Sequence, residues 1–251
     1  MAWLTVARRD APLVLSMPHT GLEIPPQYSR HLRSPWLARK DTDWWIDELY
    51  DFGASLGATI VRTAISRTVI DVNRDPSGRS LYPGQATTEL CPTTTFDGEP
   101  LYEDGLEPGA GEIATRRASF FDPYHAAIAQ ELARLRETHA TVVLYDCHSI
   151  RARIPRLFGG KLPDFNIGTY EGKSCSQQLT SAIETVCDST EYSRVTDGRF
   201  KGGYTIRHHG QPAQGVHAVQ MELACSGGCP PVEPALRRIL EACLTFAGGG
   251  P

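Results

Sequence analysis

Several features of specialised protein classes are missing from this 251-residue sequence. No apolar run approaches the length of a membrane span, and the N-terminal segment lacks the apolar stretch of a secretory signal peptide. The formal net charge of −4 does not provide the basic field that general nucleic-acid or membrane-surface binding requires. We therefore expect a cytoplasmic protein whose partner is a small molecule, and the sequence leaves its oligomeric state open.

The seven cysteines are scattered and odd in number, and no C-x-x-C pair occurs. The nearest pair is Cys225 and Cys229, and nothing elsewhere in the chain mirrors it. This pattern excludes a disulfide framework and a structural zinc ribbon, so we expect reduced thiols. Cys147 stands beside His148, but the two-residue period of a strand would turn their side chains to opposite faces, which argues against a thiol nucleophile.

Signatures of several enzyme classes are lacking as well. The sequence contains no G-x-S-x-G elbow, no G-x-G-x-x-G after a predicted strand and none of the zinc motifs with fixed spacing. It also contains no internal repeat, coiled coil or domain linker. Because α/β proteins often reach this length as one unit, we predict a single domain over residues 1–251.

Short β-branched and apolar runs alternate with helical patterns along the chain, which predicts an α/β fold with a central mixed sheet flanked by helices. We expect strands at 12–17, 58–62, 68–72, 141–145, 165–170 and 216–223. We expect helices from 41–43 to about 56, at 111–137 with a break or kink at Pro123, at 174–187 and at 233–246. The glycine-rich segments 73–111 and 198–215 should be loops, and the first is so long that we expect it to cover a site.

Polar side chains stand where three predicted strands end. His19 follows the first strand, Asp146 and His148 follow 141–145, and Glu222 stands in the last strand. Ligands of open α/β sheets bind at the carboxyl ends of strands, and period two places Asp146 and His148 on one face. A catalytic zinc is held by two imidazoles and a carboxylate, and a further carboxylate serves as the general base. Asp43, at a predicted helix start, is a further carboxylate for this site.

Simpler interpretations of these residues stay open. His19 also fits a solvated loop residue, and Asp43 fits a helix cap with no further role. Glu222 is harder to explain in that way, because a carboxylate in an apolar strand is costly unless it is paired or used in chemistry. The pair His208 and His209 is another candidate set of ligands, although exposure to solvent explains it equally well.

Asn73 and Arg74 directly follow a predicted buried strand. They suit a fork that binds a carboxylate, because Arg offers two donors in fixed geometry. An ion pair of Arg74 with Asp71 or Asp75 at the surface explains the same residues.

Nine segments of the chain carry a combined pattern. They are SMPHTGLEIP (16–25), DTDWW (41–45), SRTVIDVNRDP (66–76), LYPGQ (81–85), LCPTT (90–94), FDG (96–98), DCHS (146–149), GGYT (202–205) and QME (220–222). Each segment alone is modest, but their order and spacing are specific. Together, from about residue 10 to residue 225, they resemble the N-formylglutamate amidohydrolase (N-formylglutamate deformylase) family.

The resemblance implies hydrolysis of N-formyl-L-glutamate to formate and L-glutamate, the last step of one bacterial route of histidine degradation. It also implies a phosphorylase/hydrolase-like sheet similar to that of zinc carboxypeptidases and aspartoacylase-type deacylases. In those proteins two histidines and a glutamate hold zinc, and a strand glutamate is the base. By position, His19 and His148 correspond to ligands and Glu222 to the base.

The third ligand departs from that pattern. The relatives have His-x-x-Glu on one loop, whereas Glu23 stands one residue further on and is followed by prolines. We therefore expect Asp43 as the third ligand, with Glu23 as the alternative. Nitrogen and oxygen ligands of this kind favour zinc as the single divalent metal ion.

The implied substrate carries two carboxylates, so a basic set should bind it. The candidates are Arg67, Arg74, Arg153 and Arg207, together with the neutral Asn73 beside Arg74. A pocket distinguishes formyl from acetyl, which differ by one methyl group, by only about 1–3 kcal/mol. The alternatives are another N-acyl-amino-acid deacylase or a carboxypeptidase on the same scaffold and, from a different class, a non-catalytic module that binds amino acids without metal.

Overall fold

The computed structural model describes residues 2–226, 228 and 231–248. Within this part of the chain, one sheet contains seven strands in the order β1-β3-β2-β4-β7-β5-β6. The strands are β1 (Leu4–Ala7), β2 (Leu13–Met17), β3 (Thr59–Thr63), β4 (Val142–Arg151), β5 (Phe165–Gly168), β6 (Arg194–Thr196) and β7 (Val216–Cys225). The four neighbours β3, β2, β4 and β7 run parallel, while β1 and β5 run antiparallel to β3 and β7. The predicted α/β class with a central mixed sheet is therefore confirmed.

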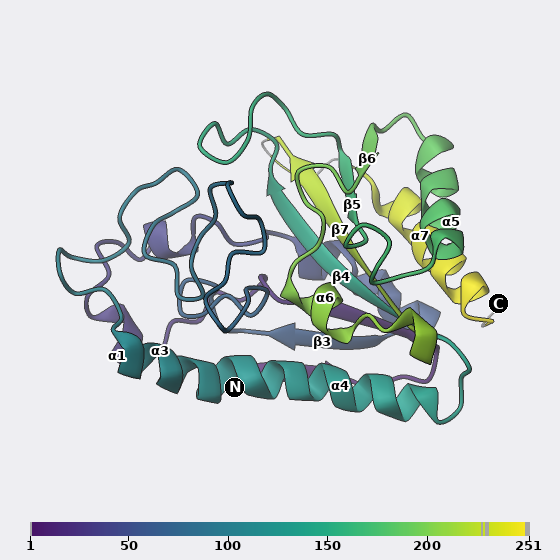
Figure 1. The fold of residues 1–251 in the computed structure, drawn as a ribbon, viewed down its shortest axis with the longest axis horizontal. Coiled ribbons are helices and arrows are strands. Elements are labelled where there is room, and N and C mark those ends of the chain that lie inside the picture. Colours follow the sequence, from purple (N-terminus) through teal and green to yellow (C-terminus); the bar gives the residue numbers. More distant parts are fainter. Residues whose placement is uncertain (1, 227, 229–230, 249–251) are drawn as a thin grey trace.

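Helices cover both faces of this sheet (Figure 1). The long helix α4 (Asp122–Arg136) lies along one face, where its Tyr124 and Ile128 pack in one cluster with strand residues such as Leu144. The helices α5 (Gln177–Asp188) and α7 (Glu233–Phe246) lie side by side on the other face. Burial of apolar side chains on both faces places the sheet at the centre of the core.

The central strand β4 shows how the sequence produces this layering. Val142 and Leu144 pack into the cluster under α4, whereas Val143, Tyr145 and Cys147 pack into the cluster under α5 and α7. This alternation is the two-residue period of a strand, and burial on both faces explains the continuous apolar run. β4 is longer than predicted, because β7 pairs with it from Val142 to Arg151. His148 therefore lies within the strand and not after it.

Two predictions of local structure are wrong. The segment 68–72 is buried but is not a strand, because its backbone turns: the amide of Val69 donates to the carbonyl of Ser66. Its apolar side chains pack in the cluster with α4. The predicted helix at 41–43 begins only at Ile46, where the four-residue α2 (Ile46–Leu49) precedes a 3₁₀ turn, Asp51–Leu56.

The two predicted loops differ in structure. Residues 73–109 contain no helix and no strand of the described chain, as expected. The segment 198–215 contains the short helix α6 (Tyr204–His209), which the sequence prediction missed. Another short helix, α1 (Pro26–Ser29), follows the first proline-rich loop.

The predicted break at Pro123 takes a milder form. Helix α3 (Ala110–Arg116) continues through a π-helical turn, Arg117–Phe121, directly into α4. Pro123 is the second residue of α4, directly after this π-helical turn. Pro lacks an amide proton and its ring crowds the preceding turn, which here is the wider π-helical turn. The helix therefore changes from α-helical to π-helical winding just before the proline, and it is not broken there.

Five cysteines, at 91, 147, 175, 187 and 243, are free and buried. Cys225 is disulfide-bonded, so the expectation of reduced thiols is wrong at this position. Cys229, the other member of the predicted nearest pair, lies outside the described residues. Among the helices that the structure describes, none is long and apolar enough to cross a membrane.

Candidate active site

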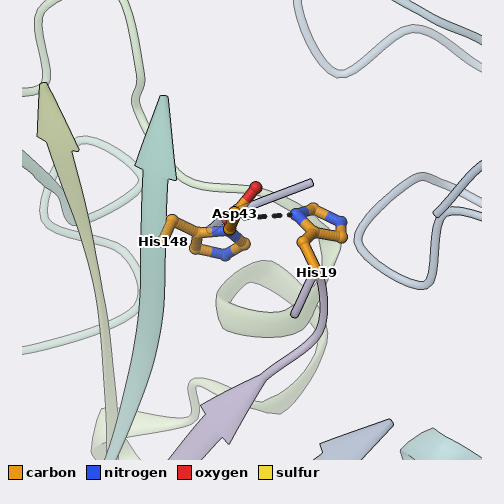
Figure 2. A group of neighbouring side chains, drawn as sticks. All are labelled: His19, Asp43 and His148. Carbon is orange, nitrogen blue, oxygen red and sulfur yellow. Dashed lines mark hydrogen bonds and ion pairs between the residues drawn. The ribbon is translucent and has the colours of Figure 1, made fainter. Parts of the chain in front are cut away.

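Three buried side chains from distant parts of the chain meet beside the parallel strands (Figure 2). His148 projects from β4, His19 follows β2, and Asp43 lies in the loop that precedes α2. The Oδ2 atom of Asp43 lies 3.0 Å from Nδ1 of His148 and 3.6 Å from Nδ1 of His19. One candidate ligand atom from each residue lies within 4.8 Å of the other two. The structure thus brings together the three residues predicted as metal ligands.

Asp43 reaches this position from the loop and does not cap a helix. Its amide donates to the carbonyl of His19 at 3.0 Å, which ties the loop back onto the end of β2. Its carboxylate accepts from the amide of Ser149 at 3.2 Å and from the guanidinium of Arg67 at 3.3 Å. A Cβ atom on Gly21 would lie 2.3 Å from the carbonyl oxygen of Ile65, so the loop passes where only glycine fits.

Each imidazole also contacts a second buried carboxylate. Nε2 of His19 lies 2.7 Å from Oδ1 of Asp71, and Nε2 of His148 lies 2.8 Å from Oδ2 of Asp146. Because an ionised carboxylate only accepts, Nε2 of each ring donates to its outer carboxylate, and Nδ1 of each ring faces Asp43. In metal sites, an outer carboxylate of this kind fixes the orientation of a histidine ring and raises its basicity as a ligand.

The donor set fits a cation. Nδ1 of His19 is buried and has no hydrogen-bond partner in the described structure. A buried acceptor without a partner is costly unless a proton or a metal ion occupies it. Two ring nitrogens and a carboxylate oxygen are the ligands of a catalytic zinc site with one open position.

Electrostatics keep this group strongly polarised. Burial opposes the charge on His148, but Asp146 and Asp43 raise the pKa of its imidazole well above the ordinary value. Burial also disfavours charged carboxylates, yet His19 holds the pKa of both Asp43 and Asp71 well below the ordinary range, with help from His148 and Arg67. Both carboxylates are therefore ionised at neutral pH.

Glu222 stands directly opposite His148 in the register of β4 and β7. Its side chain is buried and lines the same pocket as His19 and His148. Burial raises the pKa of Glu222 to about 8. A carboxyl group with a pKa near neutrality, in a cavity beside candidate metal ligands, is suited to accept and return a proton.

One pocket, termed the site pocket here, contains these groups and much of the predicted basic set. Arg67, Asn73 and Arg74 line it, and so does Arg199, which the sequence prediction missed. Arg153 is exposed and does not line it. Arg207 does not line it either: its guanidinium lies over the rings of Tyr82 and Tyr170, at 5.2 and 4.5 Å.

Two other candidate ligands lie away from this group. Glu23, the alternative third ligand, is exposed and forms an isolated bridge with Ile65. His209 is buried, and its Nε2 lies 3.0 Å from Nδ1 of His125. His209 therefore pairs with His125 in a different part of the fold and does not contribute to the group around His19.

Asn73 connects three segments of the site. Its Nδ2 donates to Asp146 at 3.2 Å, its Oδ1 accepts from the amide of Thr205 at 2.8 Å, and its carbonyl accepts from the amide of Tyr204 at 3.1 Å. A Cβ atom on Gly203 would lie 2.3 Å from its Nδ2. Asn73 thus positions Asp146 and the start of α6, in addition to facing the pocket.

Asp71 was foreseen only as an ion-pair partner, although the sequence did carry a signal. It is a carboxylate inside a buried apolar run, which is the same argument that singled out Glu222. Arg199 lies in a glycine-rich segment without periodicity, so no local pattern pointed to it.

Comparisons with known proteins agree with one another. The model of the N-formylglutamate amidohydrolase family matches residues 11–227. An N-formylglutamate deformylase of Pseudomonas aeruginosa is 48% identical over 222 residues, which cover 88% of this chain and 83% of that protein. An N-formylglutamate deformylase of Pseudomonas putida is 47% identical over 249 residues, covering 94% and 93%. Among solved structures, N-formylglutamate amidohydrolase from Ralstonia eutropha JMP134 has the same fold, with a TM-score of 0.80 at 22% identity over 99% of this chain and 98% of that chain.

Proposed function

The chain belongs to the N-formylglutamate amidohydrolase family, and on this premise we propose that it hydrolyses N-formyl-L-glutamate to formate and L-glutamate. The observation that carries the proposal is the group of His19, Asp43 and His148 in one pocket with Glu222 and several arginines. Amide hydrolysis needs an activated water, a proton acceptor and stabilisation of a developing oxyanion. The site pocket contains side chains for each of these tasks.

The ligand set that we propose is Nδ1 of His19, Nδ1 of His148 and the carboxylate of Asp43. Its support is the unpartnered Nδ1 of His19 and the outer carboxylates Asp71 and Asp146, which orient the two rings. The nitrogen and oxygen donors favour zinc. When bound, such an ion supplies Lewis-acid polarisation of the scissile carbonyl and lowers the pKa of water.

Different residues of the chain carry out the proton transfers and the stabilisation of the developing negative charge. Glu222 removes a proton from the attacking water and returns it to the departing amine nitrogen of glutamate. Arg67 is held by Asp43 and Asp71, with its Nη2 2.7 Å from Oδ2 of Asp71, and offers a fixed positive charge to the oxyanion. This division of labour is the one expected for a scaffold related to zinc carboxypeptidases, and the reaction is the last step of one bacterial route of histidine degradation.

The deciding experiment is formate release from N-formyl-L-glutamate, measured beside elemental metal analysis of the purified protein before and after chelation. We expect about one metal ion per chain, loss of formate release after chelation and its restoration by zinc. Release that survives complete removal of metal would keep the substrate and reject the mechanism. Hydrolysis of N-acetyl- or N-succinyl-L-glutamate in place of the formyl compound would assign the chain to another deacylase activity.

A further inference from the structure

Arg199 is a cation held in the site pocket by uncharged groups. Its Nε donates to the carbonyl of Leu157 and its Nη2 to the carbonyl of Ala86, each at 3.0 Å. Its guanidinium carbon lies 5.3 Å from the ring centre of Tyr82 and 5.2 Å from that of Phe200. The remaining Nη1 is buried without a hydrogen-bond partner in the described structure. Arg199 is therefore fixed in orientation and keeps one unused donor.

The arginines of the site pocket differ in how closely their charge is paired with a carboxylate of the protein. Arg67 forms ion pairs with both Asp43 and Asp71. Arg74 has one longer contact, 3.6 Å from its Nε to Oδ2 of Asp71, and this Nε is also buried without a hydrogen-bond partner. Within the described residues, Arg199 has no carboxylate at ion-pair distance. Arg199 is thus the pocket cation whose charge is not yet paired.

Arg199 is half-buried, and a partly desolvated cation without a counter-ion is unfavourable. Burial lowers the pKa of Arg199 and the nearby charge of Arg74 also lowers it, whereas Tyr82 and the carboxylate of Glu222 act in the opposite direction. Carboxylates of a ligand placed beside these two arginines would relieve this repulsion and satisfy both unused donors. The pocket is therefore complementary to a ligand with negative charge at this end.

The two arginines stand in different relations to the candidate metal ligands. Arg74 is connected to them through Asp71, which contacts both Arg74 and, at 2.7 Å, Nε2 of His19. Arg199 is anchored outside that network, on Leu157 and Ala86. In N-formylglutamate the α-carboxylate is two bonds from the amide nitrogen and the γ-carboxylate is four bonds from it. The arginine connected to the candidate ligands suits the α-carboxylate, and the arginine anchored outside that network suits the γ-carboxylate.

We propose that Arg199 binds the γ-carboxylate of the substrate and so selects an acidic side chain. This inference rests on the proposed function and assigns the specificity of the same pocket. Arg199 differs from Arg207, whose Nε donates to the carbonyl of Gly202 at 2.8 Å and whose guanidinium also lies over Tyr82, but which does not line the pocket. Arg207 therefore supplies a matched control.

The test compares kcat/KM for N-formyl-L-glutamate, its γ-amide N-formyl-L-glutamine and its α-amide N-formyl-L-isoglutamine. The unaltered protein should prefer the two compounds that have a free γ-carboxylate. Arg199→Gln should lower kcat/KM by about 10- to 150-fold for N-formyl-L-glutamate and N-formyl-L-isoglutamine, because each loses a hydrogen bond to its charged γ-carboxylate. The same substitution should change kcat/KM for the γ-amide little, because the γ-amide carries no charge there. Arg207→Gln should change all three substrates by the same factor.

Equal losses of Arg199→Gln on all three substrates, or an unaltered protein that hydrolyses the γ-amide as well as the acid, would overturn the inference. The second of these results needs no variant, and it decides the matter even if Arg199→Gln fails to fold. If the unaltered protein releases no formate from N-formyl-L-glutamate, the proposed function fails. Calorimetric binding of L-glutamate against L-glutamine then tests Arg199 separately: a preference for glutamate that Arg199→Gln removes would support its role, and no preference would reject it.

Discussion

His148 and Glu222 occupy directly opposite positions on the neighbouring parallel strands β4 and β7. A candidate metal ligand and the candidate base are thus held by one ladder of backbone hydrogen bonds, which extends from Val142 to Arg151 on β4. A slip of either strand by one residue would turn its side chain to the opposite face of the sheet, away from its partner on the other strand. The most constrained part of the fold therefore sets the geometry of the proposed chemistry.

Replacing Glu222 by Gln should stop the reaction without disturbing the site. Gln has the shape of Glu but cannot accept the proton of the attacking water, so we expect kcat to fall by about 10²- to 10⁴-fold. Formate release would measure this loss, and elemental analysis should find the metal content unchanged. An unaltered kcat would remove Glu222 from the mechanism.

The outer carboxylates should control metal affinity. Asp71→Asn and Asp146→Asn each weaken the partner that orients one imidazole, so we expect the metal affinity to fall by about 10- to 100-fold. Competition against a chromophoric chelator measures this affinity directly. Asp104→Asn is a suitable control, because Asp104 pairs with Arg33 and its side chain is 98% exposed. Equal affinity in all three variants would contradict the proposed ligand set.

Gly203→Ala should damage both stability and activity. The added methyl group would lie 2.3 Å from Nδ2 of Asn73, so the contacts of Asn73 with Asp146 and Thr205 would be lost. We expect a destabilisation of about 1–3 kcal/mol in urea unfolding, the usual cost of an overpacked site, together with slower formate release. Gly111→Ala in α3 meets no atom within 4 Å and should leave both properties intact or stabilise the helix. Similar behaviour of the two variants would show that Asn73 is not held as described.

The free energy of unfolding should decrease as the pH is lowered, in part because of His125 and His209. Burial lowers the pKa of His125 to about 4 and that of His209 to about 2, whereas in the unfolded chain both have ordinary values near 6.5. Between these limits the unfolded chain binds protons that the folded chain does not, so the free energy of unfolding falls as pH drops below about 6.5. Above pH 6.5 this contribution to stability is fully present.

His209→Gln would isolate this effect. The Nε2 atom of His125 donates to the carbonyl of Val72, so its Nδ1 accepts a hydrogen bond from His209. The amide of Gln offers the same donor without titrating. We expect urea unfolding of the variant to depend less on pH between about 6.5 and 4. Parallel pH profiles for the two proteins would mean that the histidine pair does not contribute.

The sequence pattern predicted those parts of the fold that depend on interactions between residues close together in the chain. Period two on β4 correctly separated Cys147 from His148, and the helix predicted at 174–187 is α5, which begins at Gln177 after its cap Ser176. The edge strand β1 was missed, because it is four residues long and lacks a buried face. The segment 68–72 was assigned to the sheet because it is apolar, and only tertiary contacts distinguish a buried turn from a buried strand.

The candidate substrate-binding arginines show the same limit more clearly. Arg153 was selected because it follows His148 closely, but β4 continues to Arg151, and Arg153 is exposed beyond the strand end. Arg199 was missed because its position depends on the carbonyls of Ala86 and Leu157, which are remote in sequence. Asp43 was selected as a residue that a helix start would aim at the site, whereas it reaches the group from a loop. Residues in loops are placed by long-range contacts that no short pattern encodes.

Asp43 and His148 stand 105 residues apart in the chain, and His19 comes from a third segment. An unfolded chain does not hold these donors together, so an ion on the proposed ligand set would bind the folded state alone. By mass action, an ion at a hundredfold excess over its dissociation constant would then add about 2.7 kcal/mol to the free energy of unfolding. The supply of metal in a cell would consequently govern how much of this protein persists in folded form, in addition to how fast each molecule works.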